Sequence, residues 1–100
     1  MEPIQIIGIK ELDSEEVNVV NTLASHYREK LERDLKNITS VVVHIKTSHH
    51  EGKRKKYTIK ARVVAPTKIF EASDTDWDLA RTLHMVFNDL QRQIQHSFHI

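Results

Sequence analysis

The stretch 41–63 reads VVVHIKTSHHEGKRKKYTIKARV and decides the fold. On both sides of a central Glu-Gly-Lys, apolar residues alternate with polar ones, which is the period of a strand with one buried face. A three-residue loop at 51–53, with its glycine in a left-handed conformation, pairs Ile45 with Ile59, so that the apolar faces of the two runs coincide. A two-residue loop would mismatch these faces. The stretch therefore predicts a β-hairpin with one apolar and one basic face.

Upstream of the hairpin, the sequence predicts a strand and a long helix. Residues 4–9 are β-branched and apolar on both faces, which is typical of a central or covered strand, and Gly8 marks a close approach or a bulge. Asp13 and Glu16 have the spacing of a capping box, which bonds free amides at a helix start. The helix carries an apolar stripe that we expect to face the core: Val17, Val20, Ala24, Tyr27, Leu31 and Leu35.

Downstream of the hairpin, the sequence predicts a short strand and a second helix. Pro66 ends the hairpin, residues 68–72 are long enough for a fourth strand, and a turn rich in Ser, Asp and Thr follows. Thr75 with Asp78, or Asp74 itself, is expected to cap the helix. The apolar stripe of this helix consists of Ala80, Leu83, Phe87, Leu90 and Ile94.

The order of these elements predicts the fold class α+β, with the arrangement β-α-β-β-β-α. Each helix has one apolar stripe, so we expect both to pack on the same face of a four-stranded sheet. Residues 1–100 are expected to form a single domain, because a chain of this length builds one core. The other face of the sheet is then left in water, and it carries the cations of the hairpin.

The composition argues against several classes of protein. Without cysteine there is no disulfide framework and no thiolate zinc site, and nothing favours an oxidising compartment. No apolar run approaches the ~18–20 residues of a membrane span, and the start of the chain lacks the features of a signal peptide. We therefore expect a cytoplasmic location and no membrane contact.

The sequence also lacks motifs for catalysis or cofactor binding. Gly8 and Gly52, its two glycines, are too far apart for a phosphate-binding loop, and there is no Gly-x-Ser-x-Gly elbow. His49-His50, and His96 with His99, have no carboxylate at a spacing diagnostic of a metal site. The sequence thus favours a protein without catalytic residues, metal or cofactor.

The basic face of the hairpin is the strongest candidate for function. The chain has 15 lysines and arginines and 14 aspartates and glutamates. The distribution of these charges therefore matters more than the net charge of +1. Residues 53–56 form a basic run without a compensating acid, and the hairpin pairing places His44 beside Lys60. Such density favours phosphate groups, although cations also protect exposed strands from aggregation. No aromatic platform is expected on this face, which favours recognition of RNA shape over stacking of bases.

Several stretches resemble a known family. A helix-to-strand segment contains Lys30-Leu31-Glu32, Leu35, Ile38, Val41, Val43, Ile45 and Lys46. Other matching stretches are Ile4-x-Ile6-x-Gly8, the Ala72-Ser73 turn, Asp76-Trp77 with Ala80, and Leu90-x-Arg92-Gln93-Ile94. In order and spacing these residues resemble the ribosome hibernation promoting factors, also called ribosome-associated inhibitor proteins. The end of the second helix, Gln95-His96-Ser97-Phe98, is poorer in lysine than is usual in that family.

The resemblance implies a fold akin to double-stranded RNA-binding domains. It also implies binding to ribosomal RNA of the small ribosomal subunit, in the channel for messenger and transfer RNA, which blocks translation while ribosomes are stored. The family uses basic residues on its helices as well as on its strands, and Lys30 and Arg92 match its pattern. The candidate RNA-binding residues are therefore Lys30, Arg33, His44, Lys46, Arg54, Lys56, Lys60, Arg62, Arg81 and Arg92.

Two alternative functions stay open at this point. A protein-interaction module on the same scaffold would have lost the RNA surface and would bind its partner independently of salt. A general double-stranded RNA binder would bind naked duplexes as well as ribosomes. The sequence also leaves open whether the chain forms a homodimer.

Overall fold

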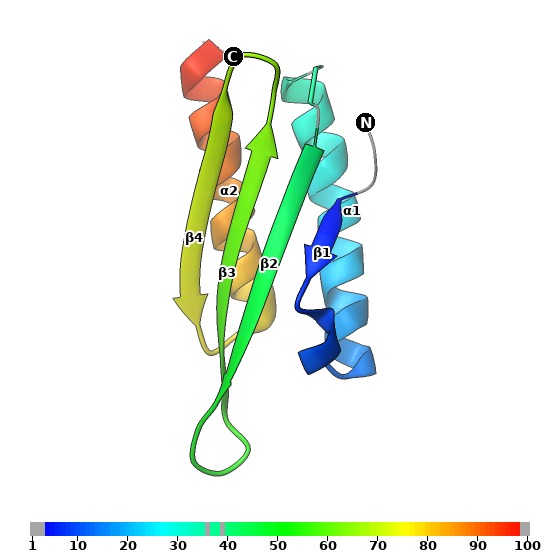
Figure 1. Cartoon of the computed structure of the whole chain (residues 1–100), viewed down its shortest axis with the longest axis vertical. Helices are drawn as coiled ribbons and strands as arrows, with labels where there is room; N and C mark the ends of the chain where they lie inside the picture. Colours follow the sequence, from blue (N-terminus) through cyan, green and yellow to red (C-terminus); the bar gives the residue numbers. More distant parts are fainter. Residues whose placement is uncertain (1–3, 36, 39, 99–100) are drawn as a thin grey trace.

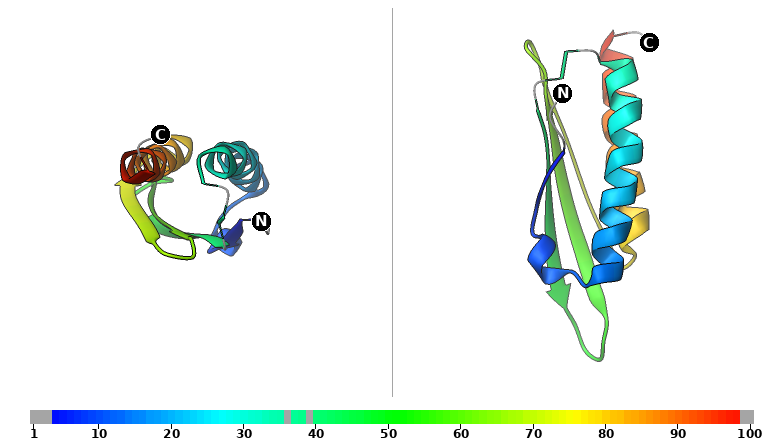
Figure 2. Two further views of the ribbon diagram at one scale, coloured as in Figure 1. Left: turned by 90° about the horizontal axis from the view of Figure 1, so that it is seen from above. Right: turned by 90° about the vertical axis from the view of Figure 1, so that its right-hand side faces the viewer.

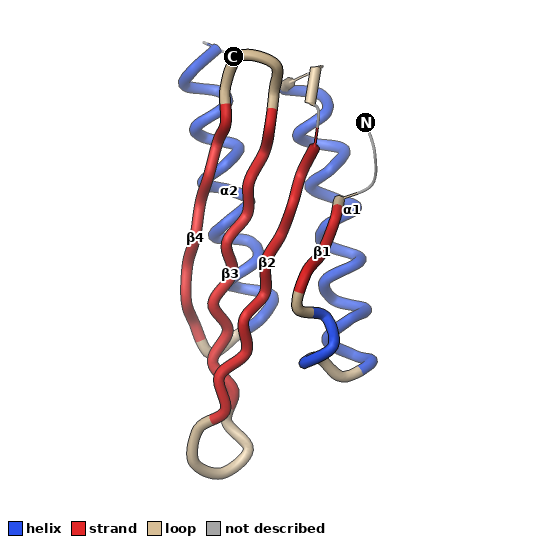
Figure 3. Tube along the Cα trace, in the orientation of Figure 1, coloured by secondary structure: helices blue, strands red, loops and turns tan. Residues whose placement is uncertain are grey.

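A computed structural model describes residues 4–35, 37–38 and 40–98. The elements in these ranges are β1 (Gln5–Ile7), the short 3-10 helix η1 (Ile9–Glu11), α1 (Ser14–Asp34), β2 (Ser40–His49), β3 (Lys55–Val64), β4 (Ile69–Asp76) and α2 (Leu79–Phe98). The strands form one sheet in the order β1-β2-β3-β4, with β1 parallel to β2 and the other neighbours antiparallel (Figure 1, Figure 3). Both helices lie side by side on one face of this sheet (Figure 2). The predicted α+β class and element order are confirmed.

The β2–β3 hairpin has the predicted register. Ile45 pairs with Ile59, as the alternation of apolar residues requires. In the loop, Gly52 is left-handed with a φ of 71°, and the His50 amide donates to the Arg54 carbonyl oxygen over 3.0 Å. The inward-facing side chains of the two strands are buried: Val41, Val43, Ile45, Tyr57, Ile59, Ala61 and Val63.

The two helices and the inner face of the sheet enclose the core. The buried residues of α1 are Val20, Ala24, Tyr27 and Leu31. Those of α2 are Leu79, Thr82, Leu83, Val86, Phe87, Leu90 and Ile94. The Tyr27 ring stacks on Phe87 with centroids 4.8 Å apart, and its hydroxyl lies 2.6 Å from His84 Nδ1. The predicted stripes are confirmed, except that Val17 and Ala80 at the helix starts are only half-buried.

β1 differs from the prediction, because it is a short strand at the edge of the sheet. It spans Gln5–Ile7, pairs with β2 alone, and leaves Ile7 42% exposed. Gly8 ends the strand, since its left-handed φ of 97° turns the chain into η1. The predicted close approach at Gly8 is confirmed, because a Cβ atom there would collide with the carbonyl oxygen of Ile45.

β4 is longer than predicted and includes the residues expected to form a Ser/Asp/Thr turn. It stays paired with β3 as far as Asp76, so the ladder of a long neighbouring strand outweighs the local turn preference. The expectation that Thr75 or Asp74 caps α2 is therefore wrong. The cap is Asp78, whose Oδ1 accepts from the Arg81 amide over 3.1 Å.

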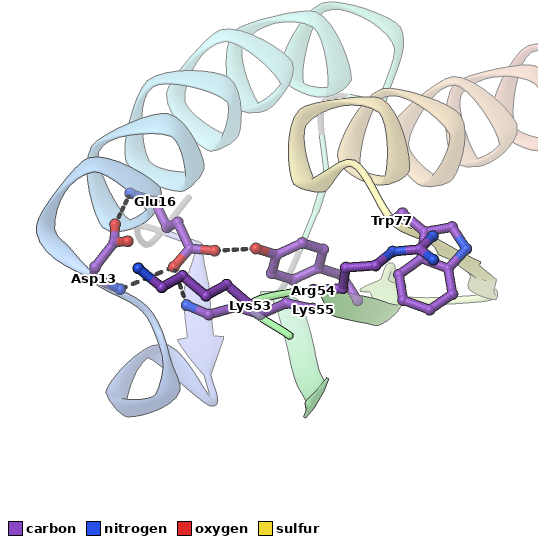
Figure 4. Close-up of a pocket in the computed structure, with 7 residues that line it drawn as sticks. Asp13, Glu16, Lys53, Arg54, Lys55 and Trp77 are labelled. Atoms are coloured by element: carbon purple, nitrogen blue, oxygen red, sulfur yellow. Dashed lines mark hydrogen bonds and ion pairs between the residues drawn. The ribbon is translucent and has the colours of Figure 1, made fainter. Parts of the chain in front are cut away.

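One carboxylate ties the start of α1 to the hairpin. Glu16 forms the predicted capping box with Asp13, whose amide lies 3.1 Å from Glu16 Oε1. The same carboxylate reaches β3, where it accepts from Lys55 Nζ at 2.9 Å and from the Tyr57 hydroxyl (Figure 4). The Glu16 side chain is only 14% exposed. It therefore links a helix start and a strand across the interior of the molecule.

The environment of Glu16 strongly favours its charged form. Burial alone would raise the pKa of Glu16, but the hydrogen bonds from Tyr57, the Asp13 amide and Lys55 outweigh it and lower the pKa to about 2. Burial and the bond to Glu16 raise the pKa of Tyr57. At physiological pH the pair is a carboxylate that accepts from a neutral phenol.

We predict that Glu16→Gln lowers the free energy of unfolding near neutral pH. The variant should also lose part of the decrease in this free energy that acid causes in the wild type. The pKa of Glu16 falls from 4.5 to about 2 on folding, so the charged form adds stability above pH 4.5 that is lost as the pH falls toward 2. The shift corresponds to at most roughly 3 kcal/mol. Urea unfolding at about pH 7 and about pH 3 measures the effect.

Glu15→Gln is the matched control, because it removes the same charge from an exposed side chain of the same helix turn. The deficit of Glu16→Gln should exceed that of the control at neutral pH and should shrink in acid. Equal deficits in the two variants, or a deficit that stays constant in acid, would contradict the stabilising role of Glu16.

We also predict that Gly8→Ala destabilises the fold more than Gly52→Ala. Both glycines have a positive φ, which costs an alanine about 1–2 kcal/mol. A Cβ atom at Gly52 meets open space, whereas one at Gly8 collides with the backbone of Ile45. The Gly8 variant should therefore lose roughly 3 kcal/mol or more in urea unfolding. Equal losses at the two positions would show that β1 does not pack closely on β2.

Candidate nucleic-acid interface

The helices leave the outer face of the sheet uncovered (Figure 2). This face carries the basic side chains of the hairpin. His44 and Lys46 of β2, and Lys60 and Arg62 of β3, are exposed there, and His44 lies opposite Lys60 in the register. Side chains alternate along a strand, so the buried core residues between them fix their outward direction. We call the outward-facing basic side chains of the hairpin the basic strip: His44, Lys46, Arg54, Lys56, Lys60 and Arg62.

The basic strip and the adjoining basic run are partly neutralised by acids. Glu71 of β4 lies beside Arg62 in the register, with Arg62 Nε 2.8 Å from Glu71 Oε1. Lys60 Nζ lies 3.9 Å from Glu71 Oε2. The hydrogen bond from Arg62 lowers the pKa of Glu71, so this acid is charged. Within the run 53–56, Lys55 pairs with Glu16. The expectation of a basic run without a compensating acid is therefore wrong.

Other cations of the hairpin keep their charge uncompensated. In the part of the chain that the structure describes, no carboxylate lies within ion-pair distance of Lys46, Lys53, Arg54 or Lys56. The pairs to Glu71 are exposed to water, and such surface pairs contribute only about 0–1 kcal/mol. Arg62 can therefore exchange its carboxylate for a phosphate at little cost.

An exposed aromatic ring lies at the hairpin end of the basic strip. Trp77, which follows β4, is 41% exposed. The Arg54 guanidinium carbon lies 4.2 Å from its ring centroid (Figure 4). Lys56 Nζ lies 5.3 Å from the same centroid. The His50 ring approaches it edge-on at 5.0 Å. Periodicity could not reveal this site, because residue 77 belongs to no strand or helix and meets the hairpin only through the fold.

The remaining candidate residues lie on the helices, away from the basic strip. Lys30 of α1 is half-buried, with its Nζ 5.3 Å from the centroid of the Tyr27 ring. Arg33 is exposed near the end of the same helix. Arg81 lies at the start of α2, with its Nε 4.0 Å from Asp76 Oδ2. The candidate residues therefore do not form one patch.

Arg92 belongs to a different surface hollow. This open pocket lies between β4 and α2, and its walls carry two carboxylates as well as the guanidinium. It is lined by Ser73, Asp74, Met85, Asn88, Asp89 and Arg92. The mixed charge makes it a weaker anion site than the basic strip.

Other kinds of site find little support in the described ranges. No group of three or more His, Asp or Glu side chains comes together there as a metal site. His49 Nε2 lies 3.9 Å from Glu11 Oε2. The other histidine pair of the sequence was His96 with His99, and His99 lies outside the described residues. Among the same residues, no helix has an apolar stretch long enough to cross a membrane.

Comparisons with known proteins agree with this geometry. The family described as sigma 54 modulation protein / S30EA ribosomal protein matches residues 11–98. No curated protein matches the sequence. Among solved structures, a ribosomal subunit interface protein from Coxiella burnetii is 18% identical with a TM-score of 0.61, and the match covers 97% of this chain and 98% of that chain.

A second solved structure shows the same fold. The N-terminal domain of Thermus thermophilus Protein Y is 16% identical with a TM-score of 0.61, and the match covers 97% of this chain and 99% of that chain. At such low identity these likenesses establish the shared fold, whereas the match over residues 11–98 establishes the family and confirms the resemblance seen in the sequence. The chain belongs to the sigma 54 modulation protein / S30EA ribosomal protein family.

Proposed function

We propose that the chain is a non-enzymatic ribosome-binding factor that contacts RNA of the small ribosomal subunit and inhibits translation while ribosomes are stored. Membership of a ribosomal protein family supports binding to the ribosome. The observation that carries the RNA contact is the basic strip, which lies on a sheet face that none of the described helices or strands covers. In this proposal residues 1–100 act as one domain in the cytoplasm.

The geometry of the basic strip suits the phosphates of a folded RNA. Cations at alternate strand positions are about 7 Å apart along a strand, and neighbouring strands are about 5 Å apart, so a rigid sheet presents them as a fixed array. Each phosphate that a lysine or arginine neutralises releases counterions. A fixed array recognises the spacing of phosphates rather than the identity of bases.

The helix cations provide a second set of contacts in this proposal. Lys30 and Arg33 lie on α1, in the layer opposite the outer sheet face. A small domain inserted in a channel meets RNA on more than one side, so these residues contact a different RNA segment from the basic strip. Arg81 and Arg92 on α2 complete this set.

The groups with large pKa shifts support a function without catalysis. A strongly perturbed pKa often marks a catalytic residue. Here the two largest shifts belong to Glu16 and Tyr57, and these side chains are hydrogen-bonded to each other as a structural link. Together with the bond from Lys55 to Glu16, they hold the hairpin on α1.

We predict that the double variant Lys46→Glu, Lys60→Glu binds purified small ribosomal subunits more weakly than the wild type at low salt. Both side chains are exposed, so the fold should persist. Each lost phosphate contact reduces the slope of log affinity against log salt by about 0.7–0.9, so the double variant should flatten it by roughly 1.5. Cosedimentation across a salt series measures both quantities.

Lys68→Glu is the control, because it reverses a charge on an exposed lysine between β3 and β4, at the end of the sheet remote from the hairpin loop. Wild-type affinity and slope in the double variant would remove the basic strip from the RNA interface. Equal affinity for naked RNA duplexes would indicate a general double-stranded RNA binder. Binding that does not respond to salt would indicate a protein-interaction module.

A further inference from the structure

Trp77 lies outside the core, on the surface of the molecule. It is the chain's single tryptophan, and 41% of it remains exposed. The large aromatic side chains that serve the core, such as Phe87 and Tyr27, are 0% and 3% exposed. A tryptophan left this exposed keeps a large apolar surface in water, which a stacked ligand would cover.

The surroundings of Trp77 are cationic. Arg54 lies over the ring at 4.2 Å, and Lys56 lies 5.3 Å from its centroid. The neighbouring carboxylates are turned toward the start of α2: Asp78 Oδ1 accepts from the Arg81 amide at 3.1 Å, and Asp76 Oδ2 lies 4.0 Å from Arg81 Nε. Arg54 and Lys56 are therefore the charged groups in contact with the ring, while both acids are engaged at the start of α2.

A pocket adjoins the ring and reaches toward α1. It is open to solvent and has a volume of about 460 Å³. Its lining residues come from three separate segments of the chain: Asp13, Glu16, Lys53, Arg54, Lys55, Tyr57 and Trp77. As Figure 4 shows, Tyr57 and Lys55 already bond to the Glu16 carboxylate, and the Arg54 guanidinium lies beside Trp77 at the other side of the pocket.

We propose that Trp77 is a stacking site for one unpaired RNA base, with Arg54 and Lys56 holding the adjacent phosphate. This inference rests on the proposed function and names the part of the RNA that the hairpin end contacts. Unpaired bases stack on aromatic rings and on guanidinium planes, and both are present here in contact with each other. The arrangement combines an aromatic face with cations, which fits a nucleotide better than an apolar or an acidic peptide segment.

The single tryptophan makes the proposal directly testable. Titration of the wild-type protein with single-stranded octaadenylate at low salt should quench the Trp77 fluorescence in a saturable way, because a stacked base contacts the indole. An RNA duplex of equal length should quench it far less. The affinity of fluorescently labelled octaadenylate is then compared between wild type, Trp77→Ala and Trp77→Phe.

Stacking predicts a specific order of affinities. Trp77→Ala should bind octaadenylate about 5- to 100-fold more weakly, whereas Trp77→Phe keeps an aromatic face and should remain within about threefold of the wild type. A purely structural role of Trp77 in holding the hairpin would not produce the quenching by single strands. Thermal unfolding shows whether each variant is folded. The titration of the wild-type protein tests the stacking site even if a variant does not fold.

The failure of this inference can be told apart from the failure of the proposed function. If the wild type cosediments with small subunits but octaadenylate causes no quenching, or if Trp77→Phe binds as weakly as Trp77→Ala, the stacking site is overturned and ribosome binding stands. If Trp77→Ala weakens cosedimentation without any binding of octaadenylate to the wild type, Trp77 contacts a protein and the inference is also overturned. If the wild type quenches with octaadenylate but does not cosediment, the stacking site stands and the ribosomal function fails.

Discussion

The register of the β2–β3 hairpin is the constraint on which both the core and the candidate interface depend. Ile45 opposite Ile59 on the inner face places His44 opposite Lys60 on the outer face. A slip of one residue would exchange the faces and bury the cations, which costs several kcal/mol for each unpaired charge. The hydrophobic effect that assembles the core therefore also gathers the basic strip, so no separate interaction is needed to bring these cations together.

A hairpin that extends past the helices needs anchors if its surface is to stay fixed. The first anchor is on the inner face of β3, where Lys55 and Tyr57 bond to Glu16 of α1. The second is on the outer face, where Arg54 contacts Trp77 after β4. Lys55 and Lys56, successive residues of β3, thus contact Glu16 and Trp77 on opposite faces of the sheet, because side chains alternate along a strand. Order at the hairpin end is what a defined RNA contact requires.

The parts of the fold that follow from local periodicity could be predicted from the sequence. The alternation on both sides of Gly52 and the Asp13–Glu16 spacing each depend on residues close together in the chain, and the structure confirms them. The predicted site residues of the hairpin come together for the same reason. The length of β4 and the position of the α2 cap at Asp78 could not be predicted, because pairing with a distant strand overrides the turn preference of residues 73–75.

Glu71 and Trp77 were missed for the same physical reason. Each of them meets its partner across a connection whose geometry the sequence pattern does not define, so no sequence period connects Glu71 with Arg62 or Trp77 with Arg54. Glu71 lies within the predicted strand 68–72, but its place beside Arg62 depends on the register between β3 and β4, which was not predicted. The orientation of Trp77 depends on the turn between β4 and α2, for which the sequence carries no repeating signal.

The presence of Glu71 changes how the basic strip would select its partner. The formal net charge is only +1, so long-range attraction to any polyanion is weak, and Glu71 further lowers the potential near Arg62 and Lys60. An RNA must therefore offer phosphates that match several cations together, since each exchange of a surface ion pair contributes little alone. In the proposed function, local alignment of phosphates with several basic side chains, rather than total charge, determines which RNA binds.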